Sequence, residues 1–224
     1  NRLILEFKDA SFYQTWSFGV FRFGEKGLSH IVLTKDGKLV GLAQVQIIRC
    51  PGLPIGIAYV SWGPMVRSSN EGPEGPHFRN MIRALRNEYV FRRRFYLRIV
   101  PQLLDSPGNA VLKEIFAEEG YSRRDSPGQN VIIDLSPTLE EIRQNMHHKW
   151  RQTLRSAEKK SLHIIEGSDD ETCRLALEVV REMKNRKQFV GGNQAEIIKI
   201  QMDLPESLKL RLLVCMDDNA PTAT

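Results

Sequence analysis

The chain has 224 residues, of which 41% are hydrophobic and 26% are charged, a composition typical of a folded globular protein and not of a disordered one. This length fits one large domain or one and a half smaller ones. The net charge of +5 and the pI near 9.2 suit a phosphate-bearing partner or an anionic membrane, although a solvated basic surface also explains them.

The first half of the chain alternates helices with β-rich runs. Apolar residues at Phe12, Trp16 and Val20 recur every four positions and predict a helix. Asp36-Gly37 between two β-rich runs is a strong hairpin signal. Because hairpins come early, we expect a mixed sheet and not a purely parallel one. The expected helices are 11–23, 77–94 and 109–119, and the expected strands are 29–33, 39–48, 55–62, 95–100 and 130–135.

From Thr138 onward the expected order is helix, strand, helix, helix, strand. The helices are 139–160, broken near His147, then 169–188 and 194–204, and the strands are 162–165 and 208–215. The residues from Asp217 to Pro221 predict a turn with no returning strand. This order repeats the start of the first half, so we predict a domain over 1–136 and a second, incomplete domain over 137–224 with an unpaired strand.

Three distant cysteines and the absence of a long apolar run constrain the compartment. Cys50, Cys173 and Cys215 are odd in number, and no two stand at metal-ligand spacing, so we expect reduced thiols and a cytoplasmic protein. No apolar run approaches the roughly 20 residues that cross a bilayer.

The segment 145–160 carries the most distinctive charge pattern. On a helix, Arg151, Arg155 and Lys159 form a basic stripe at i, i+4 spacing beside an apolar face that includes Trp150. A cationic ridge of this kind suits phosphate binding. From composition alone, an ordinary amphipathic helix with a solvated basic face is the simpler interpretation.

Familiar catalytic motifs are missing from the sequence. Adjacent His147 and His148 point about 100° apart on a helix, so they cannot readily chelate one metal ion, although either could serve as a general base. The chain has no nucleophile elbow, Walker loop or dinucleotide fingerprint. We therefore expect no metal and direct transfer between two bound substrates, catalysed by positioning and polarisation.

Four segments carry motifs in a fixed order. Residues 11–19 read Ser-Phe-Tyr-Gln-Thr-Trp-Ser-Phe-Gly, residues 59–66 read Tyr-Val-Ser-Trp-Gly-Pro-Met-Val, residues 97–101 form a strand that closes in Pro, and 149–164 carry a basic helix followed by a strand. Together they resemble the FemAB-like family of peptidoglycan aminoacyltransferases, whose motifs include Ser-Phe-x-Gln-Ser-x-x-x-Gly, Tyr-x-x-x-Gly-Pro-Val and Lys-x-Arg-x-x-Ile-Arg-x-Ala-x-Lys.

The resemblance implies an α+β fold of two GNAT-like domains in tandem, each a mixed sheet flanked by helices. It implies transfer of an aminoacyl group from charged tRNA to the peptide amine of a nucleotide-linked or lipid-linked muropeptide. No cofactor beyond these substrates is implied, and the expected place is the cytoplasm, with peripheral association at the inner face of the membrane.

The same motifs imply which residues bind substrate. By position they are Gln14, Trp16, Tyr59, Arg98, Lys149, Arg151 and Arg155. Trp62, at a strand end, is a further candidate, although a core tryptophan before a turn fits equally well. Val100 stands where the family often has an acidic residue, so no catalytic residue is named.

Two other functions stay open on the same fold. One is an acyl-CoA-dependent N-acyltransferase acting on a sugar, lipid or amino acid, whose usual Arg/Gln-x-x-Gly-x-Gly turn does not occur in the chain. The other is a binding module that has lost its chemistry, for which Val100 is the main support.

Overall fold

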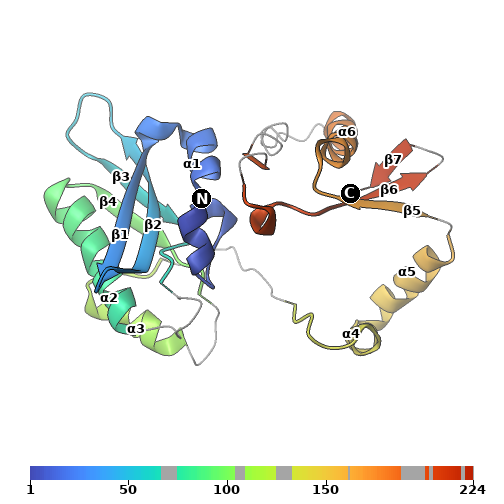
Figure 1. Cartoon of the computed structure of the whole chain (residues 1–224), viewed down its shortest axis with the longest axis horizontal. Coiled ribbons are helices and arrows are strands. Elements are labelled where there is room, and N and C mark those ends of the chain that lie inside the picture. The colour runs from blue at the N-terminus through green and yellow to red at the C-terminus, as the bar shows by residue number, and fades with distance from the viewer. Residues whose placement is uncertain are drawn as a thin grey trace. The chain divides into compact units, whose positions relative to one another are not determined.

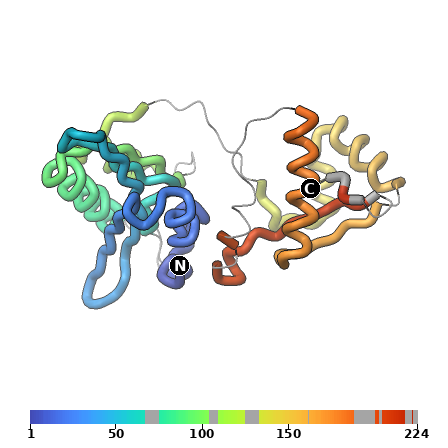
Figure 2. The backbone as a smooth tube through the Cα atoms, turned by 90° about the horizontal axis from the view of Figure 1, so that it is seen from above, coloured from blue at the N-terminus to red at the C-terminus, as the bar shows by residue number. Residues whose placement is uncertain are grey.

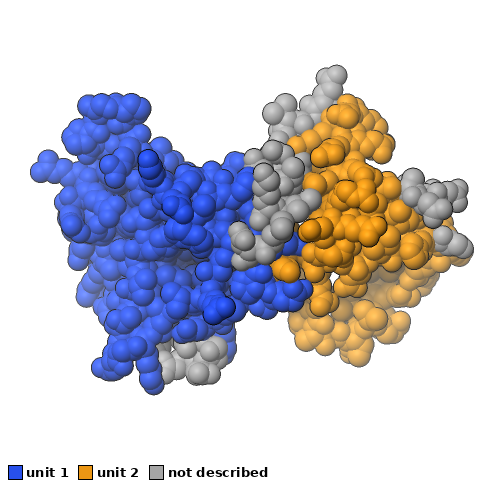
Figure 3. Space-filling view, turned by 45° about the horizontal axis from the view of Figure 1, so that its top comes forward, with its two compact units in different colours: residues 1–123, 199–208 blue, residues 124–198, 209–224 orange. Residues whose placement is uncertain are grey.

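The computed structural model describes residues 1–66, 75–103, 109–124, 133–160, 162–187, 200–201, 204–217 and 220–223. The chain forms two compact units, coloured separately in Figure 3. Unit 1 comprises Asn1–Arg123 and Lys199–Leu208, and unit 2 comprises Arg124–Ile198 and Lys209–Thr224. Each unit is described by itself, and the domain boundary expected after residue 136 stays a prediction.

Unit 1 is built on a mixed four-stranded sheet of order β1-β2-β3-β4 (Figure 1). The pairs β1–β2 and β2–β3 are antiparallel, whereas β3–β4 is parallel, so the expected mixed sheet is confirmed. The strands are β1 (Leu28–Lys35), β2 (Lys38–Arg49), β3 (Gly56–Ser61) and β4 (Tyr96–Val100). The helices are η1 (Arg2–Glu6), η2 (Phe12–Gln14), α1 (Trp16–Phe23), η3 (Glu25–Gly27), α2 (Gly75–Leu85), η4 (Arg86–Arg92) and α3 (Ala110–Glu118).

The β1–β2 hairpin forms where the sequence predicts it. Asp36 has φ of 51° and Gly37 has φ of 74°, which is the left-handed pair that a tight two-residue hairpin requires. The hairpin tip projects from unit 1 in Figure 2. The predicted helix 77–94 is only partly correct, since Arg86–Arg92 form the wider π-helix η4.

One face of the sheet holds the core of unit 1. Helix α2 covers this face with a stripe at i, i+3, i+4 and i+7 spacing, formed by Phe78, Met81, Ile82 and Leu85. Tyr89 on η4 is fully buried, and its hydroxyl lies 2.8 Å from Ser29 Oγ on β1. The helices α2 and α3 contribute to the same hydrophobic cluster as β2, β3 and β4.

The other face of β3 and β4 is open in the described part of the chain. Along β3, buried Ala58 and Val60 alternate with the more exposed Ile57, Tyr59 and Ser61, as a strand with one buried face requires. On this side the covering elements lie over β1 and β2. Trp16 of α1 contacts His30 of β1, and Ile4 and Phe7 of the N-terminal segment pack with Leu42 of β2 and with Met65.

Unit 2 contains a three-stranded antiparallel sheet of order β5-β6-β7. Its strands are β5 (His163–Gly167), β6 (Leu212–Asp217) and β7 (Ala220–Ala223), and its helices are α4 (Leu139–Asn145), α5 (His148–Glu158) and α6 (Asp170–Lys187). A capping box of Thr138 and Glu141 starts α4. The expected break near His147 is confirmed, because the His147 side chain caps α5.

Two strand predictions are wrong. The strand predicted over 208–215 is not left unpaired: β6 pairs with β5 on one side and with the returning strand β7 on the other. Ile133, Asp134 and Leu135 are not in a strand. Instead, the Asp134 carboxylate accepts the Ser136 amide at 2.9 Å, a local bond that competes with strand pairing.

Two further expectations lie partly or wholly outside the described residues. Residues 130–132 of a predicted strand are among them, as is most of the helix predicted over 194–204. No helix in the described ranges is long and apolar enough to span a membrane.

A buried carboxylate joins the two helices that cover the core of unit 1. The Glu119 side chain, 4% exposed, follows α3 and pairs with three arginines on the α2–η4 helix: Arg79 at 3.1 Å, Arg83 at 2.9 Å and Arg86 at 3.2 Å. The hydrogen bond from Arg83, followed by that from Arg79, holds the pKa of Glu119 below its usual value. The ionised carboxylate therefore stabilises the packing of α3 on α2.

This network makes stability depend on pH in a defined direction. Glu119→Gln keeps the side-chain shape but removes the charge, so we expect its melting temperature to fall several degrees below the parent at about pH 7. The carboxylate contribution is present above the unfolded pKa of about 4.3 and is lost as pH falls through the lower folded value. The difference in melting temperature should therefore shrink below about pH 4.

Glu118→Gln is the matched control, because Glu118 is 56% exposed and pairs with Arg79 alone among the described residues. Exposed ion pairs contribute little to the free energy of unfolding. If Glu118→Gln lowers the melting temperature as much as Glu119→Gln does, the stabilising role assigned to the Glu119 carboxylate is wrong.

Candidate functional site

A buried amide joins the N-terminal segment to the sheet of unit 1. The Nε2 of Gln14 donates to the carbonyl of Ser61 at 2.7 Å and to that of Gln44 at 3.2 Å, while its Oε1 accepts the Gln44 amide at 2.7 Å. Gly63 allows this approach, since a Cβ there would lie 2.8 Å from Gln14 Cδ. Gln14 is 3% exposed, so it positions its neighbours and does not itself present a surface to substrate.

A second amide extends this network to a histidine. Gln44 Nε2 donates to the carbonyl of Thr15 at 2.9 Å, which leaves its Oε1 facing His30 Nε2 at 3.1 Å. Because an amide oxygen can only accept, His30 Nε2 is the donor of this hydrogen bond. Gly19 makes room for this arrangement, as a Cβ there would lie 2.5 Å from Gln44 Nε2.

Aromatic side chains gather around the two amides. Tyr13 and Trp62 stack with centroids 5.6 Å apart and an interplanar angle of 14°, and Trp16 contacts His30 at 5.2 Å. Trp62 has φ of 54°, which is unusual for a bulky residue and persists only where surrounding contacts enforce it. Tyr13 and Trp16 are each 42% exposed, so this aromatic cluster is accessible to a ligand.

The open face of the sheet supplies a cation next to an aromatic ring. Tyr59 and Arg98 are directly paired on the parallel strands β3 and β4, and the Arg98 guanidinium lies 5.5 Å from the centre of the Tyr59 ring. This contact orients the cation without neutralising it. Neither strand contains an acidic residue, so Arg98 is available for an anionic or carbonyl group.

The three other predicted binding residues lie on α5 in unit 2. Arg151 donates to the carbonyl of Gln144 at 2.7 Å and so ties α5 to the end of α4. Lys149 and Arg155 are exposed, and their side chains have no hydrogen-bond or ion-pair partner among the described residues. Trp150 is 68% exposed, so the apolar face through which this helix was expected to pack on the protein is partly exposed to solvent.

The expected absence of a metal site stays a prediction. Within the described ranges no group of three or more His, Cys, Asp or Glu side chains could hold an ion. The rings of His147 and His148 lie 4.4 Å apart, but His147 accepts the Lys149 amide at the start of α5, so its place is explained by helix capping.

Five predicted residues lie in unit 1, namely Gln14, Trp16, Tyr59, Trp62 and Arg98, and three lie in unit 2, namely Lys149, Arg151 and Arg155. Among them, the structure shows a direct contact between Tyr59 and Arg98. Sequence reasoning missed Tyr13, His30 and Gln44. One signal was present: Gln44 is polar at the centre of the apolar run 39–48, and a polar side chain in such a run needs a buried partner.

Comparison with known structures agrees with this architecture. The chain has an α+β fold with a mixed sheet flanked by helices in unit 1, the class that its motifs implied. The fold is that of FemX: the crystal structure of FemX matches with a TM-score of 0.72 and 15% identity over 96% of this chain and 55% of FemX. The chain therefore spans about half the length of FemX.

Weaker matches include an aminoglycoside N-acetyltransferase, AAC(6')-Iy, solved in complex with CoA. It has 12% identity and a TM-score of 0.33, and the match covers 61% of this chain and 91% of that enzyme. No protein-family model matches the sequence, and no curated protein matches it.

The role assigned to Gln14 can be tested by stability. Gln14→Leu leaves the Gln44 amide and the Ser61 carbonyl without their partner, and a buried unpaired group costs about 1–3 kcal/mol. We expect a loss of that size in urea unfolding, followed by tryptophan fluorescence in a Trp150→Phe background, where the two remaining tryptophans, Trp16 and Trp62, both belong to unit 1.

Gln102→Leu is the control, because Gln102 is exposed and its change should alter the unfolding free energy little. Equal stability of Gln14→Leu and Gln102→Leu would overturn the positioning role.

Proposed function

We propose that this chain is part of an acyltransferase that moves an aminoacyl group from charged tRNA to the peptide amine of a peptidoglycan precursor. The observation that carries the proposal is the match of 96% of the chain to the FemX fold with a TM-score of 0.72. The ordered motifs of the sequence and the exposed Arg98 and Arg155 support it.

The reaction proposed is an aminolysis of an ester. The acceptor amine attacks the carbonyl carbon that joins the amino acid to the terminal ribose, so that a C–N bond forms and the ester C–O bond breaks. The proton lost by the amine ends on the ribose oxygen that leaves. No redox partner is needed, and positioning together with stabilisation of the developing oxyanion would supply the catalysis.

The residues of unit 1 have distinct roles in this proposal. Arg98, oriented by the Tyr59 ring, is placed to bind an anionic or carbonyl group of the acceptor. The stacked pair of Tyr13 and Trp62, just after the end of β3, offers a flat apolar surface. Gln14 holds the ends of β2 and β3 in place, so its contribution is indirect.

The direct test is a mass measurement. The full-length protein is incubated with a nucleotide-linked or a lipid-linked muropeptide and a pool of charged tRNA, and the acceptor is weighed. We expect a gain of one amino-acid residue that RNase treatment abolishes. No gain, with a rise in melting temperature on adding acyl-CoA, would replace the tRNA donor by acyl-CoA. If the acceptor gains no mass and acyl-CoA does not raise the melting temperature, but the protein still binds the muropeptide, the protein is a binding module without catalytic activity.

The basic helix α5 generates a separate prediction about tRNA. Each phosphate contact that is lost should weaken binding and lower the salt slope, the dependence of log affinity on log salt concentration, by about one. We expect this for Arg155→Ala and Lys149→Ala in filter binding of tRNA at several salt concentrations. Arg151→Ala should also lower the melting temperature, because Arg151 bonds to Gln144.

Arg174→Ala is the matched control for charge. Arg174 on α6 is 61% exposed and pairs with Glu178 at 3.0 Å. Arg174→Ala therefore lowers the net charge by the same amount as Arg155→Ala, but the cation that it removes is already paired. If Arg174→Ala lowers the salt slope as much as Arg155→Ala, the binding is a general effect of charge and α5 has no special role.

A further inference from the structure

A shallow pocket lies at one end of the sheet of unit 1, on the face that packs on the core. It has a volume of about 280 Å³ and is lined by Arg49, Leu53, Pro54, Ile55, Arg93 and Phe95. Phe95, just before β4, belongs to the core cluster. Tyr59 and Arg98 lie on the opposite, open face, because side chains alternate along a strand. The pocket is therefore separate from the pair of Tyr59 and Arg98.

The buried wall of the pocket is held in place by backbone contacts. The Phe95 amide donates to the carbonyl of Tyr89 at 2.8 Å and so connects this wall to η4. Gly56 on β3 leaves room for the aromatic ring, because a Cβ there would lie 3.3 Å from Phe95 Cε1. Phe95 is 9% exposed, so it offers the pocket a fixed apolar side.

The β2–β3 turn forms the aliphatic wall and is held by its own hydrogen bonds. The Cys50 amide donates to the carbonyl of Ile55 at 3.1 Å, and the Leu53 amide donates to the carbonyl of Cys50 at 3.2 Å. Gly52 has φ of 77°, and Pro54 restricts the backbone further. Leu53 and Ile55 are nevertheless 57% and 48% exposed, so a ligand that covers them removes apolar surface from water.

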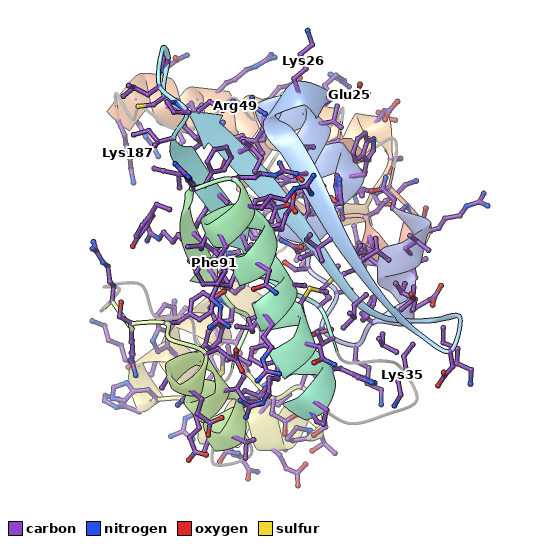
Figure 4. All side chains as sticks on the ribbon, turned by 90° about the vertical axis from the view of Figure 1, so that its left-hand side faces the viewer. Glu25, Lys26, Lys35, Arg49, Phe91 and Lys187 are labelled. Atoms are coloured by element: carbon purple, nitrogen blue, oxygen red, sulfur yellow. The ribbon has the colours of Figure 1, made fainter. Side chains whose placement is uncertain are left out.

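Two arginines with different surroundings flank this wall. Arg93 is held by Glu88, whose Oε1 lies 2.7 Å from its Nε and 2.6 Å from its Nη2, and its guanidinium lies 5.1 Å from the centre of the Tyr89 ring. Arg49 is exposed and has no hydrogen-bond or ion-pair partner among the described residues. Figure 4 shows Arg49 where the β2–β3 turn leaves the sheet, at the opposite end from Lys35. The pocket thus has one paired and one unpaired cation.

We propose that this pocket binds a small monocarboxylate with an aliphatic body, either the apolar C-terminal residue of a peptide or a short free acid. The guanidinium of Arg49 can hold a carboxylate through two parallel hydrogen bonds, while the aliphatic wall covers the body. A volume of about 280 Å³ is at the lower end for ligand sites, so the ligand is small. This binding is independent of the proposed aminoacyl transfer.

The charges around the pocket favour a carboxylate over a phosphate group. The Glu88 side chain, 17% exposed, pairs with Arg93 and also with Arg92 at 2.9 Å. A dianionic phosphate bound beside Arg93 would be repelled by this carboxylate and would have a single unpaired cation to balance it. A monoanion is neutralised by Arg49 alone, so the charge of a carboxylate matches the site.

An amide NMR titration of the whole chain tests the proposal, with N-acetyl-leucine and hexanoate as probes. We expect both to shift the amide signals of Leu53 and Ile55, with dissociation constants on the order of millimolar, because small ligands bind weakly. N-acetyl-leucinamide and hexanol lack the charge and should bind roughly tenfold more weakly. Tighter binding of N-acetyl-leucine than of hexanoate would identify a peptide end as the ligand, the reverse would identify a free acid, and both results support the site.

Substitutions separate the cation from the aliphatic wall. Arg49→Gln should weaken binding of N-acetyl-leucine roughly tenfold, because charge-assisted hydrogen bonds are lost, and should leave binding of N-acetyl-leucinamide unchanged. Leu53→Ser should weaken binding of both compounds several-fold, because it removes apolar contact area. Both side chains are exposed, so we expect both variants to fold, and a melting curve for each checks this.

Two controls match these changes elsewhere on unit 1. Lys35→Gln removes a charge at the far end of the β1–β2 hairpin, and Val111→Ser removes an apolar side chain on α3 that is also 57% exposed. Both should bind N-acetyl-leucine like the parent. The proposal is overturned if the Leu53 and Ile55 signals do not shift, if the leucinamide binds as tightly as the acid, if hexyl phosphate binds more tightly than hexanoate, or if Arg49→Gln binds like Lys35→Gln.

Discussion

The arrangement of unit 1 depends on one buried side-chain amide. The side-chain oxygen and nitrogen of Gln14 form hydrogen bonds with backbone groups of Gln44 and Ser61. These bonds connect the N-terminal segment to β2 and to the end of β3. The Gln14 amide thereby gives hydrogen-bond partners to backbone groups of β2 and β3 at the point where these two strands no longer pair with each other. With Ser61 fixed, the next residue, Trp62, can keep its left-handed backbone and stack on Tyr13.

The sheet combines this fixed end with an uneven distribution of charge. On the open face, the apolar row of Ile48, Ile57 and Tyr96 lies two residues from the row that contains Tyr59 and Arg98, roughly 7 Å along the strands.

Local signals in the sequence predicted local structure well. Asp36-Gly37 defines its turn through left-handed backbone angles, and Thr138 with Glu141 starts a helix through bonds within four residues. The roles of Gln14 and Gln44 could not be predicted in this way. Their partners lie about 30 residues apart in sequence, and nothing local specifies such a pairing. The strand β7 was missed because its four residues include Pro221, which is rare in strands.

The absence of acidic residues from β3 and β4 also limits the chemistry of the site. A carboxylate beside the acceptor could take its proton, but it would also neutralise Arg98, whose charge is the means of binding an anionic acceptor. With Val100 at the strand end, no carboxylate on β3 or β4 pairs with Arg98, and its guanidinium lies over the Tyr59 ring. In the proposed aminolysis the proton can pass to the departing ribose oxygen, so a strand-end base is not needed. Unit 1 is then suited to hold the acceptor and orient its amine, which is the part of the reaction that geometry accelerates most.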